Sequence, residues 1–223
     1  MIQALFYKEW IKTRWFLLVA LLTIMGVTGY CILRVYRAGE LNGMDHLWIV
    51  MLTRGVTFVE LLQYLPLAMG SLLALTQFVP EMHKSCLKLT LHLPHSALAT
   101  TYSMLLWGTL LLTLCFGISS GLLYGYLHTV FTTELWQQSL LTTFPWFLAG
   151  YMGYFLTSAI CLEPTWKRRI GYCVISLVLL HLFFLNHTAQ AYNPLLPFLI
   201  LLTLITATFS WLSILRFKAG CQD

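Results

Sequence analysis

The sequence predicts an all-α integral membrane protein with six membrane-spanning helices, and three observations lead to this prediction. Apolar residues make up 59% of the 223-residue chain and charged residues only 9%, which is too little charge for an ordinary soluble surface. Apolar blocks of about 20 residues, the length that crosses about 30 Å of hydrocarbon, recur along the chain. The basic residues gather in short clusters between these blocks, as in multi-pass membrane proteins.

The apolar blocks follow one another with short polar connections. The block at 97–127 is longer than a bilayer requires, and the block at 170–185 is short, since its 16 residues of helix reach only about 24 Å. The connection at 34–57 begins polar and becomes apolar again, which favours a short helix at the membrane surface. The six predicted spans are residues 15–33, 58–78, 97–127, 140–162, 170–185 and 195–215.

The positions of lysine and arginine predict the orientation. With six spans, three of the thirteen basic residues, Arg34, Arg37 and Arg54, fall on or near one side of the membrane. Because positively charged connections stay in the cytoplasm, we expect both termini to be cytoplasmic. The ten basic residues on the other, cytoplasmic side are Lys8, Lys12, Arg14, Lys84, Lys88, Lys167, Arg168, Arg169, Arg216 and Lys218.

Charge and cysteine content argue against several other classes of protein. The net charge of +5 is confined to clusters between spans, which favours membrane orientation over nucleic-acid binding. The six cysteines form no Cys-x-x-Cys pair and lie mostly within or beside apolar blocks, as packed apolar side chains do. No small-residue cleavage site follows the first block, so we expect that block to remain as a span.

Residues 80–94 interrupt the apolar pattern more than any other segment. In the stretch FVPEMHKSCLKLTLHLPHSALA (78–99), leucines alternate with polar residues, as in a β-strand. A lone strand would leave its backbone groups unpaired, and no partner strand lies nearby. Apolar residues also recur at helical spacing between two prolines, so we predict a short amphipathic helix over 80–94 at the cytoplasmic face, with a membrane-surface loop as the alternative. The helical stripe consists of Met82, Cys86, Leu89 and Leu93.

The same stretch resembles the segment between the second and third spans of type 2 ABC exporter permeases. The residues that carry the resemblance are Phe78, Glu81, Leu87, Leu89, Leu91, Leu93, Pro94, His95 and Ser96. In that family the segment is a coupling helix that docks into a groove of a separate ATP-binding subunit, and a basic, aromatic N-terminal segment forms an elbow helix along the inner membrane surface. The sequence departs from the family pattern at Pro80 and at Lys84-Ser85-Cys86, where a Gly-Thr-like pair is usual.

The resemblance implies roles for residues of both segments. Glu81 would be the acidic residue at the start of the coupling helix, and Pro94 would end that helix. The residues implied to couple to the ATPase are Glu81, Met82, His83, Lys84, Lys88 and Leu91. The implied elbow helix covers residues 1–14, with Phe6 and Trp10 in the lipid interface and with Lys8, Lys12 and Arg14 facing lipid phosphates and the partner.

The chain lacks the Gly-x-x-x-x-Gly-Lys-Ser/Thr sequence that cradles ATP phosphates. We therefore expect no catalytic residue and no bound cofactor in this chain. The resemblance implies that ATP and Mg²⁺ are held by two partner ATPase subunits, and that the membrane is a bacterial plasma (inner) membrane. The resemblance further implies a second permease copy or a related permease beside this one, and a re-entrant helical hairpin at 186–194, where a plain turn is the alternative. A membrane anchor or assembly subunit that transports nothing is the alternative function.

Three further patterns suggest packing or sites. Gly117, Gly121 and Gly125 form a tandem Gly-x-x-x-Gly in the third span, which predicts close packing on a helix of the same chain or of a second protomer. An intramembrane serine protease, a remote alternative, would pair Ser119 or Ser120 with His181, but Ile118 takes the first position of the Gly-x-Ser-Gly form. A metal site is disfavoured because Pro94 breaks the helix that would carry its ligands, His83, Cys86, His92 and His95.

Overall fold

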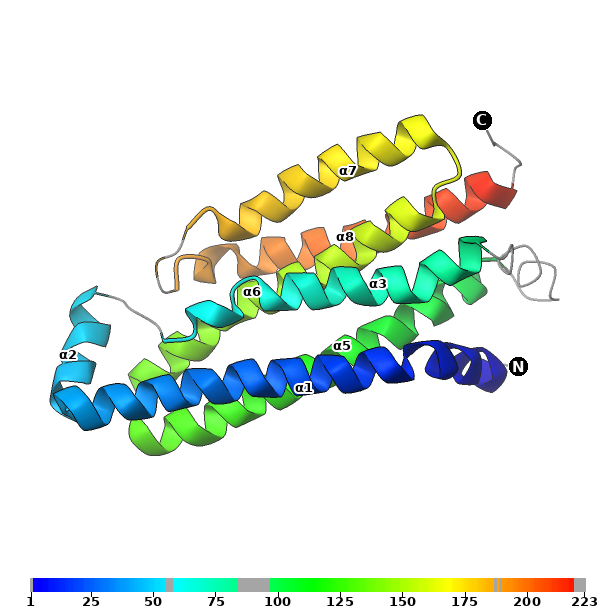
Figure 1. Ribbon diagram of the computed structural model, residues 1–223. Coiled ribbons are helices and arrows are strands. Elements are labelled where there is room, and N and C mark those ends of the chain that lie inside the picture. The colour runs from blue at the N-terminus through cyan, green and yellow to red at the C-terminus, as the bar shows by residue number, and fades with distance from the viewer. Residues whose placement is uncertain (1, 55–57, 84–96, 187, 189, 219–223) are drawn as a thin grey trace.

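The computed structural model describes residues 2–54, 58–83, 97–186, 188 and 190–218, and this part of the chain is helical without strands. Long helices alternate in direction, so both termini lie at the same end of the bundle, here named the terminal end, opposite the far end (Figure 1). The long helices are α1 (Ile2–Asn42), α3 (Leu65–His83), α5 (Ala97–Val130), α6 (Thr133–Leu162), α7 (Trp166–His181) and α8 (Leu196–Lys218).

Five of these helices are long and apolar enough to cross a membrane within the described residues, namely those at Ala4–Leu41, Glu60–Met82, Leu98–Val130, Thr133–Leu162 and Asn193–Lys218. The prediction of an all-α chain with several membrane-spanning helices is therefore confirmed at this level. α7 has 16 residues and a length of about 24 Å, shorter than the hydrocarbon layer. A sixth span at α7 stays a prediction.

α1 is one continuous helix of 41 residues, about 62 Å along its axis, and it includes residues 2–14 of the predicted elbow as well as the predicted first span. It ends at Gly43, whose φ of +80° lies in the left-handed region that glycine adopts without steric cost. The backbone N–H of Gly43 donates to the carbonyl of Gly39 at 3.0 Å. The short helix expected in the 34–57 connection is α2 (Met44–Arg54), which crosses the far end of the bundle (Figure 1).

α6 is the central helix of the bundle. Within its most apolar stretch 78% of the residues are buried inside the chain, against 28% for α1, and α6 packs on α3, α5, α7 and α8. Its closest neighbour is α3, because the two backbones touch at glycines: a Cβ built on Gly70 would lie 2.0 Å from the carbonyl oxygen of Gly150. In lipid such backbone contact is a main source of helix association, since apolar side chains gain little by leaving lipid tails.

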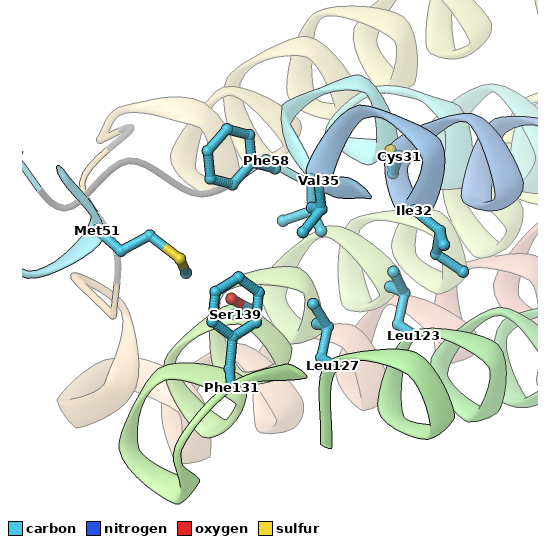
Figure 2. A pocket seen from close by; sticks show the side chains of 10 residues that line it. Cys31, Ile32, Val35, Met51, Phe58, Leu123, Leu127, Phe131 and Ser139 are labelled. Carbon is cyan, nitrogen blue, oxygen red and sulfur yellow. The ribbon is translucent and has the colours of Figure 1, made fainter. Parts of the chain in front are cut away.

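The far end is closed by apolar packing (Figure 2). Side chains from α1, α2, α5 and α6 converge there, with Met51, Val35 and Phe131 facing one another around a cavity of about 10 Å³. That space holds about one water molecule, so it is a packing gap and not a ligand site. The polar Ser139 at its edge donates to the carbonyl of Leu135 at 3.1 Å.

The connection between α7 and α8 contains two single-turn 3₁₀ helices, Leu182–Phe184 and Asn193–Leu195. Tyr192 joins them, since its hydroxyl accepts from the backbone N–H of Asn186 at 3.0 Å and donates to the carbonyl of Leu182 at 3.1 Å. The described residues of this connection form a tied turn, and no pair of re-entrant helices is among them.

The backbone contact between α3 and α6 predicts that a glycine-to-alanine substitution in α3 destabilises the protein, although alanine favours helices. We expect Gly70→Ala to lower the free energy of unfolding by about 2 kcal/mol or more, because the new methyl group meets a backbone oxygen that cannot rotate away. The control is Gly26→Ala on α1, where nothing lies within 4 Å and alanine favours the helix. Thermal unfolding in detergent checks this, and equal midpoints for the two variants would refute the contact.

Candidate functional site

The described acidic residues divide sharply between the two ends of the bundle. The side chains of Glu9, Glu81 and Glu163, at the terminal end, are 1%, 1% and 0% exposed. A buried carboxylate is costly unless cations and hydrogen-bond donors surround it, so each of these three marks a built polar site. The acidic residues that are exposed lie at the far end and are Glu40, Glu60 and Glu134.

The Glu81 cluster, made of Lys8, Glu9, Lys12 and Glu81, joins the start of α1 to the end of α3. Lys8 Nζ lies 2.8 Å from Glu81 Oε1, and Lys12 Nζ contacts the same oxygen. Lys12 also bonds Glu9 Oε1 at 3.0 Å, one turn away on α1. Two carboxylates and two ammonium groups therefore balance in charge, and Lys12 bridges both acids.

Gln77, one helical turn before Glu81, extends the polar contacts to α5 and α6. Its amide nitrogen donates to the carbonyl of Met104 on α5 at 2.8 Å. Its amide oxygen accepts from the hydroxyl of Tyr154 on α6 at 2.8 Å. Both Gln77 and Tyr154 are fully buried, so these bonds fix the end of α3 against α5 and α6.

Aromatic side chains hold the first turns of α1 on α5. Phe6 and Trp10 both contact the ring of Trp107, with centroids 5.5 and 6.3 Å apart. The indole N–H of Trp107 donates to the hydroxyl of Thr13 at 3.1 Å. The N-terminal segment is thus packed on another helix of the chain through one face, while Trp10 keeps 42% of its surface exposed.

A second site, the Glu163 cluster, joins the end of α6 to α7 and α8. The carboxylate of Glu163 accepts from Ser213 Oγ at 2.8 Å and from Arg216 Nη1 at 3.3 Å, both on α8. Its other oxygen accepts from Thr165 Oγ1 at 2.8 Å. Arg216 also donates to the hydroxyl of Tyr172 on α7 at 3.0 Å, so three helix ends meet at one carboxylate.

The structure places the predicted coupling residues only in part. Glu81 and Met82 lie in α3, with Met82 packed at the edge of the core, and His83 is the last residue of that helix. α3 passes through Pro80 without ending, so the start of the predicted segment continues the preceding helix. The predicted coupling residues Lys84, Lys88 and Leu91 lie outside the described residues.

The predicted elbow residues all lie in α1 but face different partners. Phe6 and Trp10 contact α5, and Lys8 and Lys12 turn inward to Glu81. Of the three basic elbow residues only Arg14 is exposed, with its guanidinium carbon 5.8 Å from the ring centroid of Trp15. The two inward lysines are a contact that the sequence pattern does not indicate.

The tandem glycines Gly117, Gly121 and Gly125 lie on an exposed face of α5. A Cβ built on any of them would meet nothing within 4 Å in the described chain. The neighbouring Ser119 faces inward and shares a hydrogen bond of 2.8 Å with the hydroxyl of Thr28 on α1. Ser120 donates to the carbonyl of Gly117 at 3.1 Å, so both serine hydroxyls have helix partners other than the His181 of the protease alternative.

Within the described residues, no three His, Cys, Asp or Glu side chains come together in a way that could hold a metal ion. The side chains weighed for such a site, His83, Cys86, His92 and His95, lie outside the described part. Cys31, Cys115, Cys161 and Cys173 are free thiols.

Sequence reasoning missed Glu9, Gln77 and Glu163. For Glu9 and Glu163 the sequence does contain a pattern that indicates a buried ion pair. Each is an acidic residue inside or beside a basic cluster at the end of a span, so it has a cation within reach and little water around it.

Comparison of the chain with protein-family models, with curated proteins and with solved structures finds no match. Function is therefore argued from the two clusters and the sequence.

The Glu81 cluster predicts strong energetic coupling between residues that are 69 positions apart. We expect Glu81→Gln to lower the free energy of unfolding by about 2 to 3 kcal/mol, because two lysines lose their shared carboxylate. In the double variant Lys12→Gln/Glu81→Gln the loss should be smaller than the sum of the single losses by about 1 kcal/mol or more.

Thermal unfolding of the four proteins in detergent measures this coupling. Glu134→Gln, which removes an exposed acid at the far end, is the matched control and should leave the midpoint unchanged within error. Strictly additive losses for Lys12 and Glu81 would show that the ion pair does not hold the two helices together.

Proposed function

We propose that this chain is the permease subunit of a type 2 ABC exporter, which couples a translocation path to ATP hydrolysis in a separate ATPase subunit. One observation carries the proposal: Glu81, the acid that the family resemblance puts at the start of the coupling helix, is buried and bonded to Lys8 and Lys12 of the elbow segment. The two segments that resemble the family are therefore in contact with each other.

These contacts give a physical route for coupling. The segment proposed to receive the ATPase, 84–94, follows α3 directly, so a push on it acts first on the end of α3. From there Glu81 connects to α1, and Gln77 connects to Met104 on α5 and Tyr154 on α6. In the proposed mechanism, closure of the ATPases on ATP displaces these four helix ends together and changes the packing of the spans.

Charge supports a cytoplasmic position for the terminal end, where an ATPase would dock. The described basic residues near the termini and at the start of α7 all lie at this end, whereas Arg34 and Arg37 lie toward the far end of α1 (Figure 1). By the positive-inside rule this end faces the cytoplasm of the proposed plasma-membrane location. The chain carries no ATP-binding sequence of its own, so ATP and Mg²⁺ belong to the partner subunits.

The open glycine face supports a second permease copy or paralogue beside this one. Gly117, Gly121 and Gly125 would let another helix backbone approach α5, yet no helix of the described chain occupies that face. A dimer that packs there would place a path between protomers, as the family resemblance implies. If lipid alone covers this face, Gly121→Leu should leave the dimer fraction unchanged.

Docking of an ATPase is testable by purification from the native membrane. We expect the tagged chain to carry with it a protein with ATP-binding-cassette sequences and vanadate-sensitive ATP hydrolysis. Replacing residues 84–91 with a Gly-Ser linker of equal length should abolish this binding, because it removes the docking segment. Glu81→Gln should keep the ATPase bound and lower ATP hydrolysis roughly tenfold, since it cuts the route from the docking segment to α1.

Glu134→Gln is the control for the docking experiment, because it removes an exposed acid at the opposite end of the bundle. Purification without any such ATPase would favour the membrane anchor or assembly subunit. Binding that survives replacement of residues 84–91 would likewise contradict the permease proposal.

The glycine face gives a separate prediction about self-association. We expect Gly121→Leu to weaken the dimer by about tenfold or more, because a bulky side chain keeps a second helix away from α5. The monomer's thermal midpoint should not fall, since a side chain at this position meets open space. Single-molecule photobleaching in liposomes gives the dimer fraction, and an unchanged fraction would remove the glycine face from the dimer contact.

A further inference from the structure

A groove of about 450 Å³ opens at the terminal end of the bundle, between the ends of α3 and α6 and the start of α7. It is lined by Val79 and Met82 of α3, Ile160 and Cys161 of α6, and Arg169 of α7. Its described lining is apolar apart from one guanidinium group. Such a lining suits a ligand with an apolar body and a single anionic group.

α7, which borders the groove, packs mainly on α6, and its Tyr172 also contacts Arg216 and Phe209 of α8. Among the residues of α7 only Ser176 is buried, and the helix lies at the edge of the bundle (Figure 1). Val174, Leu177 and Val178 expose more than half of their surface. In a membrane, lipid covers exposed apolar side chains of this kind.

Most of the N–H donors of Arg169 have no acceptor among the described residues. The guanidinium of Arg169 has five N–H groups. Among the described residues only Nη2 has an acceptor, the carbonyl oxygen of Glu163 at 2.8 Å. The Nε atom is buried and has no acceptor there. Among the described residues, Arg169 has no salt bridge to a carboxylate, and the carboxylate of Glu163 is bonded to Arg216. Lys167 and Arg168, which precede Arg169 in the first turn of α7, are exposed, so this helix end carries three positive charges.

Trp166 indicates the depth of this helix end in the membrane. Its ring is 65% exposed and lies under the guanidinium of Arg169, whose carbon is 5.7 Å from the ring centroid. Exposed tryptophan next to lysine and arginine is typical of the level of lipid headgroups. Arg169 thus lies at headgroup level, and the apolar lining extends from it toward the hydrocarbon.

We propose that this groove binds an anionic phospholipid of the surrounding membrane. Its phosphate is held by Arg169 in charge-assisted hydrogen bonds, and Lys167 and Arg168 add to the attraction. One acyl chain lies along Val79, Met82, Ile160 and Cys161 and fills the space between α3 and α7. The site uses no residue of the Glu81 cluster, although its lining includes Met82, one of the residues implied to couple to the ATPase. Lipid retention is measured without any ATPase, so its result is read separately from that of the docking experiment.

Native mass spectrometry of the detergent-purified chain tests the site. With phosphatidylglycerol we expect one lipid to be retained at least tenfold more tightly than phosphatidylcholine, because only the former carries a net negative charge. Arg169→Gln should reduce the retention of phosphatidylglycerol about tenfold. Ile160→Trp, which fills the groove and leaves its charge intact, should reduce retention as well.

Arg37→Gln is the matched control, since it removes an exposed arginine at the other end of the bundle and should leave retention unchanged. Millimolar inorganic phosphate should not displace the lipid, because it lacks the acyl chain. Displacement by phosphate, or equal retention of the two lipids, would overturn the proposal. If residues 84–96 of the same chain occupied the groove, neither Arg169→Gln nor Ile160→Trp would change retention, and that result would overturn it too.

Discussion

The ion pair between Glu81 and two lysines of α1 determines how the terminal end of the bundle is assembled. A carboxylate with 1% exposure needs cations at contact distance, and the chain brings them from a segment 69 residues earlier. This requirement fixes the rotation of α1, because Lys8 and Lys12 lie one turn apart on the same face. Trp107 packs beside that face, so the ionic and aromatic contacts reinforce each other.

The two ends of the bundle are held by different forces. At the terminal end, buried acids pair with lysine and arginine. These ion pairs, together with the hydrogen bonds of Gln77 and Arg216, join α1, α3, α5, α6, α7 and α8. Between the ends, glycine contacts and short hydroxyl bonds, such as Ser158 with Ser210 at 2.6 Å, join helices that lipid would otherwise separate. The far end is closed by apolar packing, and its described acidic residues are exposed. Polar coupling is therefore concentrated where the proposed ATPase would dock.

The sequence predicts the positions of the long helices well and their contacts poorly. Hydropathy places the helices α5, α6 and α8 within a few residues at most ends, because a span must be apolar along its length. For α1, hydropathy predicts a span of only 15–33, because the helix continues at both ends of the apolar block into polar residues. The contact of Glu81 with Lys12 depends on how two distant helices cross, and no local pattern contains that information. The close approach of Gly70 to Gly150 is hidden for the same reason.

The long separation between Lys12 and Glu81 has a consequence for biosynthesis. The lysines leave the ribosome 69 residues before their acid, which is roughly 3 to 14 seconds at ordinary rates of translation. During that interval the lysines lack the carboxylate that they contact in the folded chain. The start of α1 can therefore reach its final place on α3 only after α3 has been made.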